Sequence, residues 1–261
     1  MKIPFFQVDA FSSKAFGGNP AAICVLNCRL DNDVMQKIAE ENNLSETAFV
    51  VPISTGNYEL KWFTPTIEID LCGHATLASA FVLFEYYDQD KTALKFQTAS
   101  GELSVEKSAK LLSMNFPARP PVGVNLPGIL AEALGAEPSY VLESRDLMAI
   151  FEDENTIQNM TPDFDKIKNI KSHFAVIVSA PGKRSDFVSR FFAPNAGVNE
   201  DPVTGSAHCT LIPYWAKRLN QKKLHAFQLS SRRGEIFCEY LGDRVSISGH
   251  STLFAKGEIY I

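Results

Sequence analysis

Two stretches of the sequence place ionisable residues directly before a helix-favouring apolar run. The first is residues 70–78, DLCGHATLA, and the second is residues 200–207, EDPVTGSA. A glycine at the start of a helix lets a ligand approach the backbone closely. The first turn of a helix also carries unpaired N–H groups and a partial positive charge, so it attracts carboxylate or phosphate. Each stretch therefore predicts a binding site for a small anion.

The two stretches also match each other. Residues 63–65, FTP, align with residues 192–194, FAP, and residues 73–75, GHA, align with residues 205–207, GSA, with three extra residues in the second copy. A match at about half the chain length indicates an internal duplication. Two such helix starts that face each other would hold one small anion with side chains from both halves. Two unrelated turn–helix junctions are the alternative.

Three residues near these stretches could carry a proton: Glu46, His74 and Asp201. Glu46 stands just before an apolar strand, and in the internal alignment it falls near Ser172 or His173, so the first half supplies an acid that the second lacks. Each candidate has a structural alternative. Glu46 could be a solvated strand-end carboxylate, His74 a capping or packing residue, and Asp201 an N-cap.

Cys72 is a further candidate, because a helix start favours the thiolate form of cysteine. Its counterpart in the internal alignment is Thr204, so a mechanism with two equivalent thiols is disfavoured. His208 lies one turn into an apolar helix and is assigned to packing. Asp70 and Glu200 are assigned to turns or caps.

Composition narrows the class of protein. The chain has 261 residues, a net charge of −5 and 45% hydrophobic residues, which disfavours nucleic acid or an anionic membrane as the main partner. The N-terminus lacks the apolar core of a signal peptide, and no apolar run approaches ~18 residues. Five cysteines without a CxxC pair favour free thiols in a reducing cytoplasm. No metal, flavin or pyridoxal signature is present, so we expect chemistry without a cofactor.

The pattern of apolar residues predicts an α+β fold. Many short strands surround one long apolar helix in each half, residues 74–87 and 208–218, so each half is expected to be a curled, mostly antiparallel sheet around a central helix. A proline-rich stretch near residue 120 suggests domains at 1–117 and 118–252. Residues 253–261 are expected to cross back to the first domain. An amphipathic helix is predicted at 31–42.

Five motifs in this order resemble the phenazine-biosynthesis PhzF-like isomerase family. They are residues 8–11 (VDAF), 16–22 (FGGNPAA), 43–49 (NLSETAF), 71–76 (LCGHAT) and 200–207 (EDPVTGSA). The family is similar to diaminopimelate epimerase in fold, with two similar domains and a site in the cleft. The resemblance implies that Glu46 shuttles a proton with His74 and Asp201 assisting. It implies substrate-binding residues at Asn19, Gly73, Thr204, Gly205 and Ser206.

The residues and the resemblance together predict a cofactor-independent isomerase that moves a proton between carbons of a small carboxylate. One base suffices for a shift on one face, whereas inversion at one carbon needs groups on opposite faces. An amino-acid epimerase that uses Cys72 or Glu46 is one alternative, and a non-enzymatic anion-binding protein is another. A homodimer is also expected, from family members that pair and from aromatic residues that flank the strands: Trp62, Phe63, Phe191 and Phe192.

Overall fold

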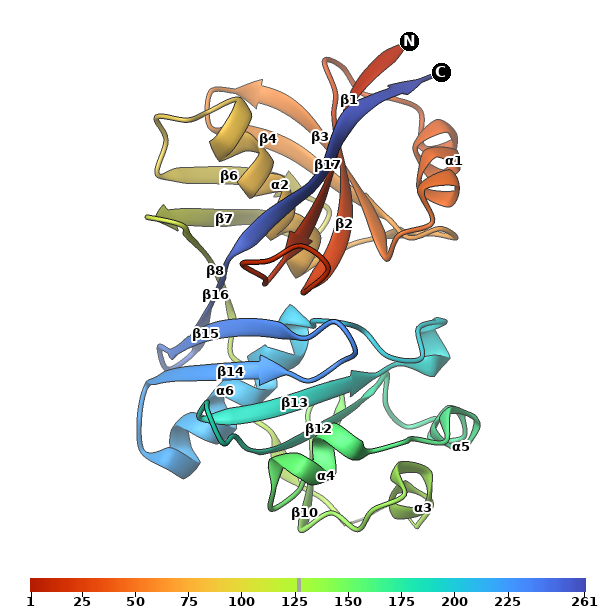
Figure 1. Cartoon of the computed structure of the whole chain (residues 1–261), viewed down its shortest axis with the longest axis vertical. Coiled ribbons are helices and arrows are strands. Elements are labelled where there is room, and N and C mark those ends of the chain that lie inside the picture. The colour runs from red at the N-terminus through yellow and green to blue at the C-terminus, as the bar shows by residue number, and fades with distance from the viewer. Residues whose placement is uncertain (126–127) are drawn as a thin grey trace. The chain divides into compact units, whose positions relative to one another are not determined.

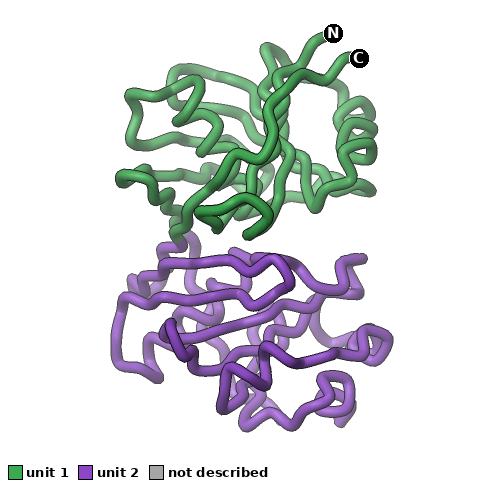
Figure 2. Tube along the Cα trace, viewed as in Figure 1, with its two compact units in different colours: residues 1–115, 248–261 green, residues 116–247 purple. Residues whose placement is uncertain are grey.

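The computed structural model describes residues 1–125 and 128–261, which form two compact units. Unit 1 comprises residues 1–115 and 248–261, and unit 2 comprises residues 116–247 (Figure 2). In the described part of the chain, no helix is long and apolar enough to cross a membrane. Both units are mixed α+β structures dominated by strands, as the sequence predicts (Figure 1).

The sheet of unit 1 is built by eight strands in the pairing order β17-β1-β2-β3-β4-β6-β7-β8. Two of these pairings, β2 with β3 and β4 with β6, are parallel, and the others are antiparallel. The last strand of the chain pairs with the first over their whole length. The eight strands are β1 (Lys2–Ala10), β2 (Asn19–Val25), β3 (Glu46–Ser54), β4 (Asn57–Phe63), β6 (Ala93–Thr98), β7 (Gly101–Ser108), β8 (Leu111–Pro117) and β17 (Ser251–Tyr260). The two-residue strand β5 (Glu68–Ile69) pairs with the end of β4.

Two helices cover opposite faces of this sheet. Helix α1 (Asn32–Asn42) packs Met35 and Ile38 against Phe49 of β3. Helix α2 (Gly73–Tyr86) has ten buried residues and packs against β1, β2 and β3. Because successive residues of a strand point to opposite faces, Phe49 on the α1 face implies that Glu46, three residues earlier, lies on the α2 face. The predicted central helix of the first half is therefore the helix that faces Glu46.

Unit 2 repeats this design. Its main sheet has the pairing order β9-β10-β11-β12-β13-β14-β15, and α6 (Gly205–Leu219) packs against β14 and β15. Besides α6, the elements of unit 2 are β9 (Val122–Gly123), α3 (Leu130–Leu134), β10 (Tyr140–Glu143), β11 (Leu147–Ile150), α4 (Glu154–Asn159), α5 (Phe164–Lys168), β12 (Val176–Pro181), β13 (Phe187–Phe192), the 3-10 turn η1 (Pro194–Ala196), β14 (Lys223–Gln228), β15 (Gly234–Tyr240) and β16 (Arg244–Gly249).

The order of parallel and antiparallel pairings is the same in the two units. Strands β1, β2, β3, β4, β6 and β7 alternate between antiparallel and parallel neighbours, and β10 to β15 alternate identically. Helix α2 connects the parallel pair β4 and β6, and α6 connects the parallel pair β13 and β14. The duplication indicated by two short sequence matches thus extends through the strand topology.

Two helices of unit 2 differ from what the sequence predicts. Helix α6 begins at Gly205, three residues before the predicted start, because the extended Thr204 is its N-cap. Helix α4 was not predicted; it is only six residues long, and Asp153 caps it by accepting the N–H of Thr156.

Candidate functional site

The side chain of the N-cap residue of helix α2 does not cap the first backbone N–H groups of the helix. Its N-cap is Cys72, whose backbone is extended and whose side chain makes no capping hydrogen bond, and Gly73 is its first residue. Helix α6 begins in the same way, with Thr204 as an extended N-cap that makes no side-chain cap and Gly205 as its first residue. The first N–H groups of each helix therefore have no side-chain oxygen to pair with at the N-cap, as an anion-binding helix start requires.

In unit 1 the start of α2 lies beside the starts of two strands. Nε2 of His74 is 2.9 Å from Oε2 of Glu46, the first residue of β3. Nδ1 of His74 is 3.1 Å from the amide nitrogen of Asn19, the first residue of β2, and 3.5 Å from Sγ of Cys72. In the neutral ring, donation from the Asn19 side-chain amide to Nδ1 leaves the ring proton on Nε2, the nitrogen next to Glu46, whereas the protonated ring carries a proton on both nitrogens. The ring thus bridges a carboxylate and an amide.

The electrostatics of this cluster follow from its burial. Burial alone lowers the pKa of His74, but the neighbouring Cys72 and Glu46 raise it well above its usual value. Burial, together with the Glu46 carboxylate, raises the pKa of the Cys72 thiol. The side chain of His74 is 6% exposed and that of Glu46 is 15% exposed. Glu46 is thus the acidic group of the cluster that solvent and a ligand can reach, whereas Cys72 is held as a thiol.

The loop between β1 and β2 fixes the position of Asn19. The buried Asp9 accepts the backbone N–H of Phe16 at 2.8 Å. Gly18 has a φ of +65°, and a Cβ at this position would lie 2.0 Å from the carbonyl oxygen of Ala10. Only glycine fits both the backbone angle and the close approach. The turn at residues 17–20, GGNP, therefore carries Asn19 to the cluster.

In unit 2, Asp201 and Thr204 form a second polar cluster at the start of α6. Oγ1 of Thr204 donates to Oδ2 of Asp201 at 2.5 Å. The Gln228 side chain accepts the N–H of Thr204 at 2.9 Å and donates to the carbonyl of Asp201 at 2.8 Å. Gln228 was not predicted, since nothing in the sequence distinguishes it. It reaches this loop because β14 pairs with β13, the strand before the loop.

Ser206 contacts a residue that the sequence analysis also missed. Its Oγ accepts from Nη2 of Arg145 at 3.3 Å, and Nε of Arg145 donates to the fully buried Asp146 at 3.2 Å. The only sequence signal is an Arg-Asp pair between two short strands. Glu46, His74 and Asn19 thus come together in unit 1, and Asp201, Thr204, Gly205 and Ser206 come together in unit 2.

The strand register corrects the internal alignment of Glu46. Phe63 pairs with Thr47, and its counterpart Phe192 pairs with Val176. The position equivalent to Glu46 is therefore Ala175, not Ser172 or His173, because the loop before β12 differs in length. Ala175 is 4% exposed and carries no acid.

The other polar candidates have structural partners. His173 contacts Glu143 at 3.0 Å, and Arg190 donates to both carboxylate oxygens of Glu200 at 2.7 and 3.0 Å. His208 is fully buried and donates its Nδ1–H to the carbonyl of Thr204, and burial lowers its pKa to about 4. The carbonyl of the exposed Asp70 accepts from Ser100. These contacts agree with the turn, cap and packing roles expected for Asp70, Glu200 and His208.

Glu46, Cys72 and His74 also place three potential metal ligands within 4.8 Å of one another. Cys72 approaches Nδ1 of the imidazole, whereas Glu46 approaches Nε2. A single ion would bind only one of the two ring nitrogens, so it could not replace both of these contacts.

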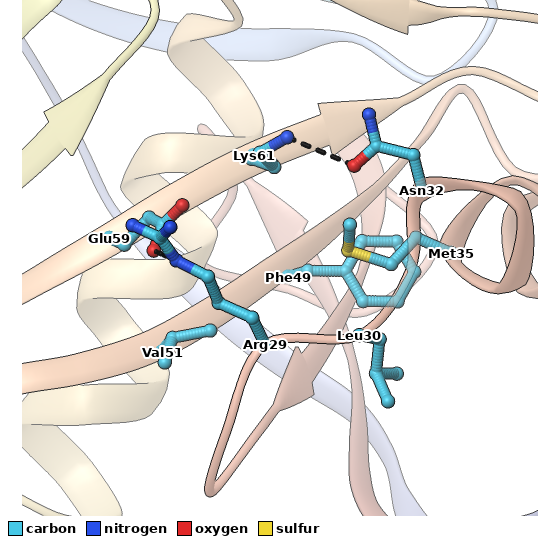
Figure 3. A pocket seen from close by; sticks show the side chains of 8 residues that line it. All are labelled: Arg29, Leu30, Asn32, Met35, Phe49, Val51, Glu59 and Lys61. Atoms are coloured by element: carbon cyan, nitrogen blue, oxygen red, sulfur yellow. Dashed lines mark hydrogen bonds and ion pairs between the residues drawn. The ribbon is translucent and has the colours of Figure 1, made fainter.

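A surface cavity of about 190 Å³ lies elsewhere in unit 1 (Figure 3). Met35 of α1, Phe49 and Val51 line it, and the Arg29–Glu59 ion pair crosses its rim. Phe49 faces α1, so this cavity is on the face of the sheet opposite to Glu46 and His74. It is not part of the cluster at α2.

The fold of this chain, two α+β units with the same strand topology, is found in other solved structures. A predicted epimerase from Pseudomonas aeruginosa shares this fold with a TM-score of 0.76, at 18% identity over 99% of both chains. The chain belongs to the phenazine biosynthesis-like family, PhzC-PhzF, which it matches over residues 8–257.

Two similar proteins cover the whole chain. An uncharacterized isomerase of Pseudomonas aeruginosa is 50% identical over 261 residues, which is all of both sequences. The crystal structure of a PhzF-family phenazine biosynthesis protein from Enterococcus faecalis has a TM-score of 0.98 at 49% identity and full coverage of both chains. These similarities support an isomerase, as the sequence analysis predicts.

Proposed function

We propose that the protein is a cofactor-independent isomerase that moves a proton between two carbons of a small carboxylate-bearing substrate. Glu46 is the proton carrier, and His74 and Asp201 assist it in a cleft to which both units contribute. The observation that carries this proposal is the 2.9 Å contact between Glu46 and His74 beside the uncapped start of α2.

The geometry of Glu46 suits proton transfer. Oε2 of Glu46 lies 2.9 Å from Nε2 of His74, but it is buried and has no hydrogen bond of good geometry among the described residues. The contact with the imidazole restricts the carboxylate, and no hydrogen bond from the described residues engages the oxygen that would take a proton from carbon. A positioned carboxylate of this kind contributes about 10²–10⁴-fold to a rate.

The helix starts suit the substrate's negative charge. The N–H groups of Gly73, Gly205 and their neighbours are oriented donors, and their dipoles favour an anion at the helix start. When a proton leaves a carbon next to a carboxylate, charge spreads toward the carboxylate oxygens. Donors that already face those oxygens stabilise that charge without reorganising.

The strand register favours an isomerase over an epimerase. Inversion at one carbon needs a second proton carrier, and unit 2 offers Ala175 where unit 1 has Glu46, and Thr204 where unit 1 has Cys72. One carrier suffices to move a proton along one face of a conjugated substrate.

Nuclear magnetic resonance in D₂O with a panel of small unsaturated cyclic carboxylates tests the proposal. The expected product has its double bond at a new position and gains hydrogen or deuterium at a carbon other than the one that lost the proton. Deuterium at the α-carbon with inversion would instead identify an epimerase. Thermal stabilisation by carboxylates with no chemical change in any of them would identify a binding protein.

A further inference from the structure

The duplication lets the cluster of unit 1 be compared residue by residue with unit 2. In unit 1, Ala22 of β2 pairs with Thr47 of β3, and in unit 2, Leu147 of β11 pairs with Val176 of β12 in the same way. Ala22 therefore corresponds to Leu147. Two and three residues earlier in the chain, Pro20 corresponds to Arg145 and Asn19 corresponds to Ser144. His74 corresponds to Ser206. Unit 1 thus places an amide and an acid against a histidine, whereas unit 2 places a guanidinium against a serine at the equivalent helix start.

Arg145 is fixed from three sides. Its Nε donates to the buried Asp146 at 3.2 Å, its Nη2 donates to Ser206 at 3.3 Å, and its guanidinium lies 4.8 Å from the ring centre of Phe174. Its side chain is nevertheless 38% exposed. A guanidinium held in this way offers an oriented pair of donors and loses little entropy on binding a ligand.

Two buried polar atoms in the same cluster have no hydrogen-bond partner among the described residues. They are Oδ2 of Asp146, a residue that is 0% exposed, and Nη1 of Arg119. The N–H of Arg119 donates to the carbonyl of Cys209 in the first turns of α6, and both arginines influence Asp146 and Cys209 electrostatically. Burial raises the pKa of Asp146, although both arginines lower it. The cluster is therefore rich in positive charge in a chain whose net charge is −5.

We infer that Arg145, together with Ser206 and the first turn of α6, forms an anion site that binds a carboxylate of the substrate through the guanidinium edge. This inference rests on the proposed function and adds a specificity-determining residue to it. Asp146 is the positioning residue that holds Nε and turns the Nη edge outward. A carboxylate fits this edge because two parallel N–H donors match its two oxygens.

Calorimetric titration tests the inference with matched ligand pairs, each a small cyclic carboxylate and its carboxamide. The wild-type protein is expected to prefer the carboxylate. Arg145→Met should bind it roughly 10- to 100-fold more weakly, and Arg145→Lys should recover only part of the loss because lysine lacks the fork. Asp146→Asn should weaken carboxylate binding less than Arg145→Met does. Arg29→Met in unit 1, where Arg29 pairs with Glu59, is the matched control and should bind as wild type.

The outcomes separate this inference from the proposed function. Wild-type affinity in Arg145→Met, or no preference for carboxylate over carboxamide in the wild-type protein, would overturn the anion site. In turnover, Arg145→Met should raise KM more than it lowers kcat, whereas Glu46→Gln should lower kcat and keep carboxylate binding. Full turnover in Glu46→Gln would instead refute the proton carrier and leave the Arg145 site standing. Arg145→Lys also controls for misfolding, because it keeps a positive charge beside Asp146.

Discussion

Nε2 of His74 and Oε2 of Glu46 lie 2.9 Å apart, although the two residues belong to a helix and a strand 28 positions apart in the chain. The contact exists because the side chain of Glu46, the first residue of β3, lies on the face of the sheet that α2 covers. It orients the carboxylate and links the charge state of the imidazole to the stability of unit 1.

Replacing Glu46 with glutamine should abolish most turnover. Glutamine keeps the shape and can still hydrogen-bond to His74, but it cannot accept a proton. We expect a loss on the order of 10²–10⁴-fold in kcat, with carboxylate affinity retained because the helix-start donors are unchanged. Cys72→Ser is the matched comparison and should be milder. An inactive Cys72→Ser with an active Glu46→Gln would move the protein to a thiol-dependent class.

Alkylation should distinguish the cysteines without a substrate. Burial and the Glu46 carboxylate raise the pKa of Cys72, whereas Cys28 is exposed. Because the thiolate is the reactive form, iodoacetamide at neutral pH should label Cys28 first and Cys72 only slowly in the folded protein. Mass spectrometry of tryptic peptides measures both. Rapid labelling of Cys72 would contradict its assignment as a buried thiol.

Stability should depend on pH through His74. Its folded-state pKa is raised well above the unfolded value of 6.5, so the folded state holds the proton more tightly. The stabilisation is fully present below about pH 6.5 and is lost as pH rises through the folded-state pKa. Urea unfolding of wild type and His74→Gln over this range measures it as the difference between the two curves. Parallel curves would show that the pair contributes no such linkage.

Gly18→Ala should destabilise unit 1 more than Gly56→Ala does. Both glycines have positive φ, +65° and +74°, but a Cβ at Gly18 meets the carbonyl of Ala10 at 2.0 Å, whereas at Gly56 the nearest atom is 3.9 Å away. We expect about 1 kcal/mol for Gly56→Ala from backbone strain and roughly 3 kcal/mol for Gly18→Ala. Chemical denaturation gives both values. Equal effects would mean that the loop before Asn19 relaxes around the new methyl group.

Homodimer formation stays a prediction, although the aromatic residues that flank the strands no longer support it. Trp62, Phe63, Phe191 and Phe192 are each at most 4% exposed, so they fill the cores of the two units rather than a surface. Light scattering at micromolar concentration should give twice the chain mass of 28.9 kDa if the protein pairs. A mass near that of one chain would remove the dimer.

Much of the fold and part of the site could be predicted from the sequence alone. Apolar periodicity and turn residues depend on neighbours in the chain, so they located most strands and the central helices closely. The family motifs suggested Glu46, His74 and Asp201 as candidates, and the structure brings Glu46 and His74 together in unit 1. Helix α4 escaped prediction because six residues carry too little periodicity. The start of α6 was placed late because its first residues, Gly205 and Ser206, are weak helix formers.

The tertiary structure decided which side chains meet. The true counterpart of Glu46 is Ala175, a relation that depends on strand register rather than on aligned letters. Gln228 and Arg145 reach the start of α6 from other strands or their ends, and no local pattern marks them. A contact between residues distant in sequence is set by sheet pairing and by burial of α6, both long-range effects of packing. The sequence determined which chemical groups are available, and the packing of strands around each central helix determined their partners.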